Sequence, residues 1–120
     1  MANRIEDYAL LGDTESAALV SKDGSIDWCC FPRFDSGACF AALVGTDDNG
    51  HWSIRPTRPF TATRRYVPDT LVLETTFTTD EGSVTVTDAL VPRPDEHRLV
   101  RLVQGQTGRV EMHTELVIRF

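Results

Sequence analysis

The amino-acid sequence predicts an all-β protein, an antiparallel β-sandwich with one short helix. Apolar and polar residues alternate in several runs, as they do in strands that bury one face. Turn-forming residues such as Gly, Asp, Asn and Pro separate these runs at short intervals. A single segment, residues 36–45, has instead the capping residues and the apolar run of a helix. These three observations favour two packed antiparallel sheets.

The first predicted hairpin covers residues 16–31. Its strands read SAALV and IDWCCF, and the SKDGS between them is a turn in which Gly24 supplies a positive φ. Strict alternation predicts two faces for the second strand, with Ile26, Trp28 and Cys30 on one and Asp27, Cys29 and Phe31 on the other. Because both faces are largely apolar, we expect this strand to be covered on both sides.

The segment SGACFAALVG is the helix candidate. Ser36 is a suitable N-cap and Gly45 a suitable C′ stop around an apolar run, so a short α-helix or a 3₁₀ segment fits there. After the polar turn TDDNG, two further strands are expected, HWSIRP at 51–56 and TATRRYV at 61–67.

Two more hairpins are predicted in the C-terminal half. TLVLETTFTT (70–79) and VTVTDALV (84–91) are joined by the turn DEGS, and RLVRLVQG (98–105) and RVEMHTELVIRF (109–120) by QTG. The last strand alternates regularly up to Phe120. Because domains rarely stop in the middle of a sheet, we expect residues 1–120 to be one sandwich domain of a longer protein; the alternative is that this strand is simply the last one of the fold.

Composition narrows the function classes. The 120 residues carry 12 basic and 18 acidic side chains, for a formal net charge of −6. This balance argues against nucleic acid or an anionic membrane as a main partner, since both require a positive surface. The N-terminus lacks the basic start of a signal peptide, and no apolar run approaches the roughly 18 residues of a membrane helix. The sequence therefore predicts a soluble, cytoplasmic protein.

The cysteine and histidine spacing does not favour a metal site or a cofactor. Cys29 and Cys30 are adjacent, so on a strand they point to opposite faces and cannot easily grip one ion together. Cys39 stands alone, and the three histidines have no paired-ligand spacing. We expect buried free thiols and neither metal nor cofactor.

Two groups of residues are candidates for chemistry on sugars. Asp27 and Asp35 lie among aromatic residues, as paired carboxylates of a glycosidase do. The alternative is structural: Arg33 or backbone N–H groups hold Asp27, and Asp35 serves the turn before the helix. A sugar-stacking platform or, alternatively, core packing would use the aromatic residues Trp28, Phe31, Phe34, Trp52 and Tyr66.

Longer strings of the sequence add a family resemblance. IEDYALLGDTESAALVSKDGSIDWCCFPRFDSGACFAALVG, RRYVPDTLVLET, VTVTDALVPR and ELVIRF together resemble the N-terminal region of bacterial and archaeal glycoside hydrolase family 15 proteins. These are glucoamylase-like and trehalase-like enzymes. The resemblance covers essentially the whole chain and is specific, because long ordered strings match.

The resemblance implies an N-terminal β-sandwich, part of a supersandwich domain, that precedes an (α/α)₆ catalytic barrel in the same polypeptide. Substrates in the family are α-linked glucosides such as trehalose and maltooligosaccharides, which are hydrolysed with inversion by two glutamates. Those glutamates belong to the barrel, so the resemblance implies no catalytic residue in this chain and no activity for the chain alone.

We therefore expect a non-catalytic domain that supports the barrel and lends it a loop, residues 32–36. The candidates for contact with substrate or barrel are Trp28, Arg33, Phe34 and Asp35, and the structural candidates are Gly24, Asp27, Ser36 and Gly45. The alternative is a free-standing all-β module that binds carbohydrate or another partner. A docking or oligomerising role would instead predict an apolar patch and open strand edges, which also allows a homo-oligomer.

Overall fold

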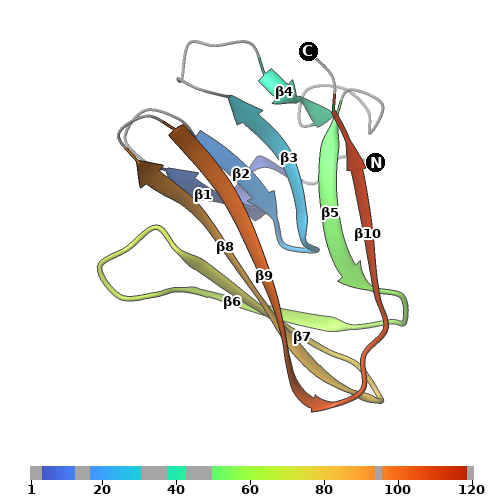
Figure 1. The fold of residues 1–120 in the computed structure, drawn as a ribbon. Helices are drawn as coiled ribbons and strands as arrows, with labels where there is room; N and C mark the ends of the chain where they lie inside the picture. Colours follow the sequence, from blue (N-terminus) through green and yellow to red (C-terminus); the bar gives the residue numbers. More distant parts are fainter. Residues whose placement is uncertain (1–3, 13–16, 31–37, 43–49, 94–95, 119–120) are drawn as a thin grey trace.

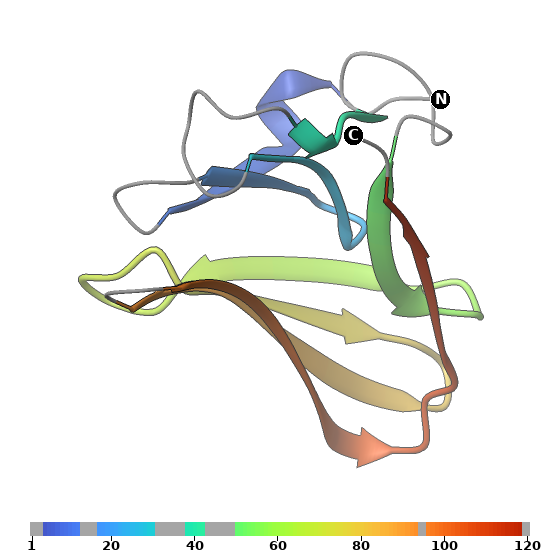
Figure 2. The same ribbon diagram turned by 45° about the horizontal axis from the view of Figure 1, so that its top comes forward.

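The computed structural model describes residues 4–12, 17–30, 38–42, 50–93 and 96–118. In these residues ten strands form two antiparallel sheets, which stack as the layers of a sandwich (Figures 1 and 2). The predicted all-β sandwich is thereby confirmed. A short 3₁₀ turn, η1 (Ile5–Asp7), precedes the first strand.

The first sheet has the strand order β1-β2-β3-β5-β10, with β4 off this path. Its strands are β1 (Tyr8–Gly12), β2 (Ala17–Ser21), β3 (Ser25–Cys30), β4 (Ala38–Phe40), β5 (His51–Pro56) and β10 (Met112–Val117). Strand β3 is central, because it pairs with β2 along one edge and shares the other edge between β5 at its start and β4 at its end.

The second sheet is a meander of four consecutive strands. They are β6 (Thr61–Tyr66), β7 (Leu73–Thr78), β8 (Gly82–Arg93) and β9 (Glu96–Gly108). Figure 2 shows this layer beneath β1, β2 and β3, while β5 and β10 stand along one side of the molecule and reach toward it.

Several predicted elements are confirmed. Strands β2 and β3 form the first hairpin, and Gly24 in its turn has a φ of 90°. Strands β7 and β8 form the hairpin predicted around DEGS. Strands β5 and β6 lie where HWSIRP and TATRRYV predicted them. The turn chemistry of these segments is local, so the sequence is sufficient to place them.

The third predicted hairpin is wrong. Strand β9 continues through the supposed QTG turn, and Gly108 pairs with Gly82 of β8. The chain turns only at Gly108, whose φ is 60°, and β10 then joins the first sheet beside β5. The alternation of β10 correctly predicts a strand, but a two-residue period does not predict which sheet the strand joins.

The helix expected over residues 36–45 is not formed where the structure describes that segment, since Ala38–Phe40 is strand β4. It pairs with the end of β3 through Cys29↔Phe40 and Cys30↔Ala38, beyond the point where β5 leaves that edge. A short apolar run is compatible with either structure, and here the backbone groups of β3 require a partner. Ser36 and Gly45 lie outside the described residues.

The core between the sheets consists of two apolar clusters. The larger one joins the inner faces of the first sheet to the second sheet and contains Ala9, Leu11, Ala18, Val20, Ile26, Cys29, Phe40, Leu73 and Leu90. The other contains Ile54, Phe77, Val84 and Val86. Trp52 packs against both, so this half-buried indole bridges the two clusters. Phe60 adds an edge-to-face contact with Phe77, with ring centroids 5.0 Å apart.

A buried arginine crosses the space between the sheets. Arg101 on β9 pairs with Asp88 on β8, with Nε 2.7 Å from Oδ1, and the two side chains are 0% and 1% exposed. Its other nitrogens reach the first sheet, where they donate to the carbonyl oxygens of Trp52 (2.6 Å) and Gly24 (2.9 Å). The guanidinium also lies 5.4 Å from the centroid of the Trp52 ring.

Burial raises the pKa of the Asp88 carboxyl above its ordinary value, and the charge and hydrogen bonds of Arg101 act in the opposite direction. The two groups are therefore interdependent, since either one alone would be a buried charge without compensation. We call Arg101, Asp88 and the two carbonyl groups the arginine clamp.

Replacing Arg101 by Met should destabilise the protein by about 3–5 kcal/mol, because it leaves the buried Asp88 carboxylate without its charge partner and removes the hydrogen bonds of Arg101 to the Trp52 and Gly24 carbonyls. Urea unfolding followed by tryptophan fluorescence measures this loss. The control is Arg58→Met, which removes an arginine whose ion pair with Asp80 is exposed to solvent, and which should barely move the midpoint. Equal midpoints for the two variants would show that the clamp stabilises the fold no more than an exposed ion pair does.

Thr75 offers the opposite test, a substitution that should stabilise the fold. In the part of the chain that the structure describes, its Oγ1 is the one buried side-chain polar atom without a hydrogen-bond partner, and the residue is 1% exposed. Thr75→Val keeps the shape and removes the unsatisfied hydroxyl, so we expect a gain of about 1 kcal/mol. Thr76→Val is the control, because the Thr76 hydroxyl bonds to Thr85 and its loss should not stabilise. A destabilised Thr75→Val variant would contradict the interpretation that this hydroxyl is buried without a hydrogen bond.

Candidate functional site

Gly24 lies at the turn between β2 and β3. A Cβ at this position would lie 2.4 Å from the carbonyl oxygen of Ile54 and 3.0 Å from the ring of Phe77, in addition to the strain of a positive φ. The close approach has a function in the fold. The Gly24 carbonyl accepts hydrogen bonds from Ile54 N–H and from Arg101, which joins the hairpin to β5 and to the second sheet.

Trp28 does not lie where strict alternation placed it. The register of β2 and β3 passes from Val20↔Ile26 to Leu19↔Trp28, so Asp27 is an extra residue in a β-bulge. Beyond the bulge the parity is reversed, and Ile26 and Cys29 both join the core. The expected sharing of one face by Ile26 and Trp28 is therefore wrong. Trp28 lies half-buried opposite Leu19, on the face turned away from the second sheet.

Asp27 has other partners than the ones we expected. Its carboxylate accepts hydrogen bonds from the Tyr8 and Ser25 hydroxyls, at 2.5 Å each, and the residue is 7% exposed. It thereby ties β1 to β3 across the intervening strand. The predicted partner Arg33 lies outside the described residues. A buried carboxylate that already accepts two hydroxyl donors is suited to holding strands together rather than to acid–base chemistry.

Asp27 belongs to a larger polar face on the side of the first sheet turned away from the second sheet. Its buried members are Ser21, Ser25, Asp27, His51 and Ser53. Ser21 Oγ accepts from Ser25 N–H at 3.0 Å, and His51 Nε2 lies 2.9 Å from Glu115 Oε1. The burial of this face could not be predicted from the sequence, because polar residues that alternate with Trp52 and Ile54 are typical of a strand surface open to water.

The polar face also includes an ion pair at the turn of the β2–β3 hairpin. Asp23 accepts from Arg55 at 3.1 Å, so the turn of the hairpin is fixed to the neighbouring β5. These hydrogen bonds and ion pairs connect β1, β2, β3, β5 and β10. The arrangement can hold β3 rigidly at its centre.

The remaining candidates of the sequence analysis fall outside the described residues. These are Arg33, Phe34, Asp35, Ser36 and Gly45. Within the described ranges, no three His, Cys, Asp or Glu side chains gather in a group that could hold a metal ion. The described residues also contain no helix with the length and apolar character needed to cross a membrane.

The two lateral sides of the sandwich differ. On one side, Tyr66 of β6 closes the edge of β1: its hydroxyl donates to the Leu10 carbonyl oxygen and accepts from Leu10 N–H, both at 3.0 Å. Arg64 adds a bond to the Val20 carbonyl oxygen. On the other side, β9 and β10 are the edge strands of their sheets. These two strands, with the residue after Val117, carry exposed apolar side chains: Val100, Leu102, Val103, Leu116 and Ile118, at 42–56% exposure.

We call this side, formed by β9 and β10 with those five side chains, the open side. Unpaired strand edges that carry exposed apolar residues are sites where other strands or surfaces bind. Trp52 lies inside the sandwich, where it packs on both clusters and donates from Nε1 to Thr114 Oγ1 at 3.1 Å. It is therefore unsuited to the sugar-platform role that its residue type suggested.

Comparison with known proteins gives consistent matches. The family model described as "Trehalase-like, N-terminal" matches residues 1–114. A trehalase of Mycolicibacterium smegmatis is 37% identical over 90% of this chain, and one of Mycobacterium tuberculosis is 42% identical over 90%. The match covers 19% of each of these relatives. Trehalase 1 of Sulfolobus acidocaldarius is 42% identical over 67% of the chain and 14% of its own length. No solved structure matches.

The role of Asp27 as a tie between strands predicts a loss of stability on truncation of either partner. Asp27→Ala should cost about 2–3 kcal/mol, because it leaves two hydroxyls without their acceptor. Tyr8→Phe removes only one donor and should cost about 1–2 kcal/mol. Chemical denaturation of the single and double variants measures both, and the double variant should lose less than the sum. Strictly additive losses would contradict a direct Tyr8–Asp27 contact.

Proposed function

Because this chain belongs to the trehalase-like N-terminal domain family, we propose that it is the non-catalytic β-sandwich part of a longer inverting α-glucoside hydrolase. Residues 1–120 support a catalytic (α/α)₆ barrel in the same polypeptide. The parent enzyme, of glycoside hydrolase family 15, acts in the cytoplasm on trehalose or on maltooligosaccharides, as a trehalase or a glucoamylase. The chain alone has no activity.

One observation carries the proposal. Most of this chain, 90%, matches the trehalases of two mycobacterial species, yet the match covers only 19% of their length. The two buried carboxylates that the structure describes, Asp27 and Asp88, already have partners in the fold. Asp27 is engaged by two hydroxyls, and Asp88 is enclosed with Arg101. An inverting pair would instead need a cleft with room for a water molecule between two carboxyl groups about 6.5–9.5 Å apart.

The open side is the surface that fits the rest of such an enzyme. Strands β9 and β10 can accept further strands or a packed helix, and their exposed Leu102 and Leu116 would become buried. On the opposite side, the Tyr66 hydroxyl already engages the backbone N–H and carbonyl of Leu10. A sandwich with one closed and one open side is therefore suited to docking another part of the enzyme through its open side.

The loop after β3 is proposed as the part that approaches the substrate or the barrel. It contains Arg33, Phe34 and Asp35, and Trp28 precedes it on β3. What supports the proposal is the rigidity of its base: the bulge and the Asp27 hydrogen bonds fix the end of β3. A loop that leaves a rigid strand can position a side chain accurately.

A domain exchange tests the supporting role. The matching N-terminal region of the Mycolicibacterium smegmatis trehalase is either replaced by this chain or deleted, and glucose release from trehalose is measured. We expect the exchanged enzyme to retain at least a tenth of the parent activity and the deleted one to lose all of it. This 120-residue chain alone should release no glucose.

Substitution on the open side sharpens the test. In the exchanged enzyme, Leu102→Glu should lower the yield of active protein several-fold, because a charge would be buried at the docking surface. Leu10→Glu is the matched control, since Leu10 is 44% exposed on the closed side. Full activity of the deleted enzyme, or equal effects of the two substitutions, would overturn the proposal.

A further inference from the structure

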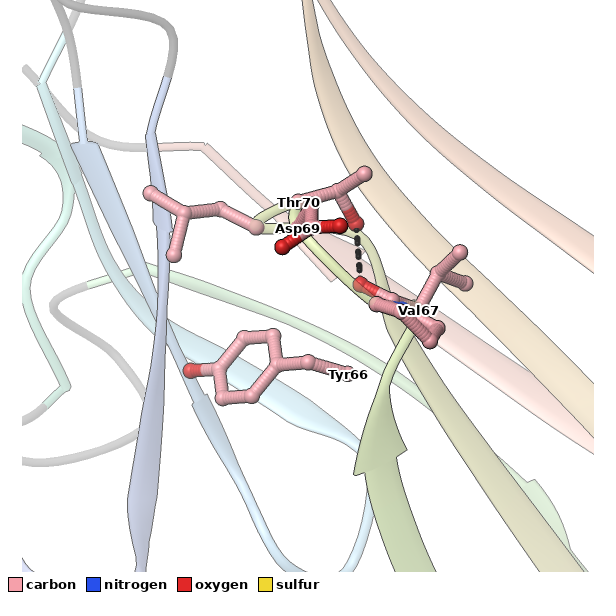
Figure 3. Close-up of a pocket in the computed structure, with 6 residues that line it drawn as sticks. Tyr66, Val67, Asp69 and Thr70 are labelled. Carbon is pink, nitrogen blue, oxygen red and sulfur yellow. Dashed lines mark hydrogen bonds between the residues drawn. The ribbon is translucent and has the colours of Figure 1, made fainter.

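The loop between β6 and β7 forms a surface pocket of about 440 Å³. Residues 66–71 line it: Tyr66, Val67, Pro68, Asp69, Thr70 and Leu71. Figure 3 shows the Tyr66 ring on one side of this space and Asp69 and Thr70 at the crest of the loop across from it. The volume lies in the range of small-ligand sites, about 300–1,000 Å³.

The Tyr66 ring is a fixed platform. Its hydroxyl makes two hydrogen bonds of 3.0 Å to the backbone of Leu10, one as donor and one as acceptor, so the ring cannot turn freely. The residue is nevertheless 40% exposed. An aromatic face held in place before a ligand arrives loses little conformational entropy on binding.

The loop itself is rigid. Thr70 N–H donates to the Val67 carbonyl oxygen at 3.1 Å and closes a turn with Pro68 and Asp69 at its centre. The Thr70 hydroxyl donates to the same carbonyl at 2.7 Å and accepts from Val72 N–H at 3.1 Å. Val67 N–H in turn donates to the Val72 carbonyl oxygen at 2.9 Å.

Asp69 is the unusual member of this loop. Among the non-glycine residues that the structure describes, it is the one with a positive φ, 63°. Gly or Asn would occupy this position of the turn with less strain. The Asp69 side chain is exposed, and within the described residues its carboxylate has no hydrogen-bond or ion-pair partner. The carboxylate therefore does nothing for the fold that would offset the strain.

We propose that this pocket is a binding site for a pyranose sugar. The C–H face of a sugar ring packs on the Tyr66 ring, two neighbouring hydroxyls donate to the Asp69 carboxylate, and Pro68 and Leu71 form the apolar rim. The pocket is larger than a lone guanidinium group needs, which favours a sugar over an arginine side chain of a partner. This site stands independently of the proposed role beside a catalytic barrel.

Titration of the ¹⁵N-labelled chain with trehalose and with maltose tests the site. We expect amide shifts confined to residues 66–71 and to the facing Leu10, with saturation in the millimolar range. Asp69→Asn should raise the dissociation constant at least fivefold and leave the fold as stable as before or more so. Asp80→Asn is the matched control, because it removes the same charge from a different turn and should leave the affinity unchanged.

Asp69→Gly separates the backbone strain at this position from the proposed role of the carboxylate in sugar binding. It should raise the midpoint of thermal unfolding and abolish the sugar shifts, since it relieves the strain and removes the carboxylate. Three results would overturn the proposal. The first is no shift at residues 66–71 with either sugar at 100 mM. The second is unchanged affinity in Asp69→Asn, and the third is a response of the same residues to L-arginine but not to sugars. None of these outcomes bears on the domain exchange, so the two proposals fail separately.

Discussion

The arginine clamp is the interaction on which the rest of the structure depends. Hydrophobic contact alone would let the two sheets slide, since apolar packing is not directional. Arg101 removes that freedom, because one planar group must meet Asp88 on its own sheet and the carbonyls of Gly24 and Trp52 on the other. The turn of the β2–β3 hairpin, the start of β5 and the middle of β8 and β9 are thereby held in one register.

The two faces of the first sheet have different roles in the fold. The inner face contributes apolar residues to the core, whereas the outer face holds buried serines, Asp27 and His51. The bulge at Asp27 connects the two, because it keeps Ile26 and Cys29 inside while Asp27 and Trp28 lie outside. An unbroken strand would have put either Cys29 or Ile26 on the wrong side. The bulge therefore sets which face each residue of β3 occupies after Asp27.

The sequence was sufficient for the elements whose causes are local. Gly24 and DEGS placed two hairpins, because turn residues act over a few positions. It was insufficient where the cause is distant. Strand β10 alternates equally well beside β9 or beside β5, and only the free edge of β5 decides. The bulge in SIDWCC leaves no local mark, and the burial of Ser53 and His51 depends on what lies over the sheet. The role of Arg101 also has no local mark, because its partners Asp88, Trp52 and Gly24 are distant in the sequence.

Asp69 and Thr75 show how strain and incomplete hydrogen bonding are distributed in this fold. Thr75 lies in the core with an unused hydroxyl, and valine would serve its packing equally well. Asp69 lies at the surface in a backbone conformation that favours other residues, beside a ring that is fixed but exposed. The first departure is enclosed in the core, whereas the second lines a surface pocket. Where a strained residue lies on a surface that can bind a ligand, function is expected to oppose stability. This contrast is why the loop after β6, and not the core, is where a binding role is assigned.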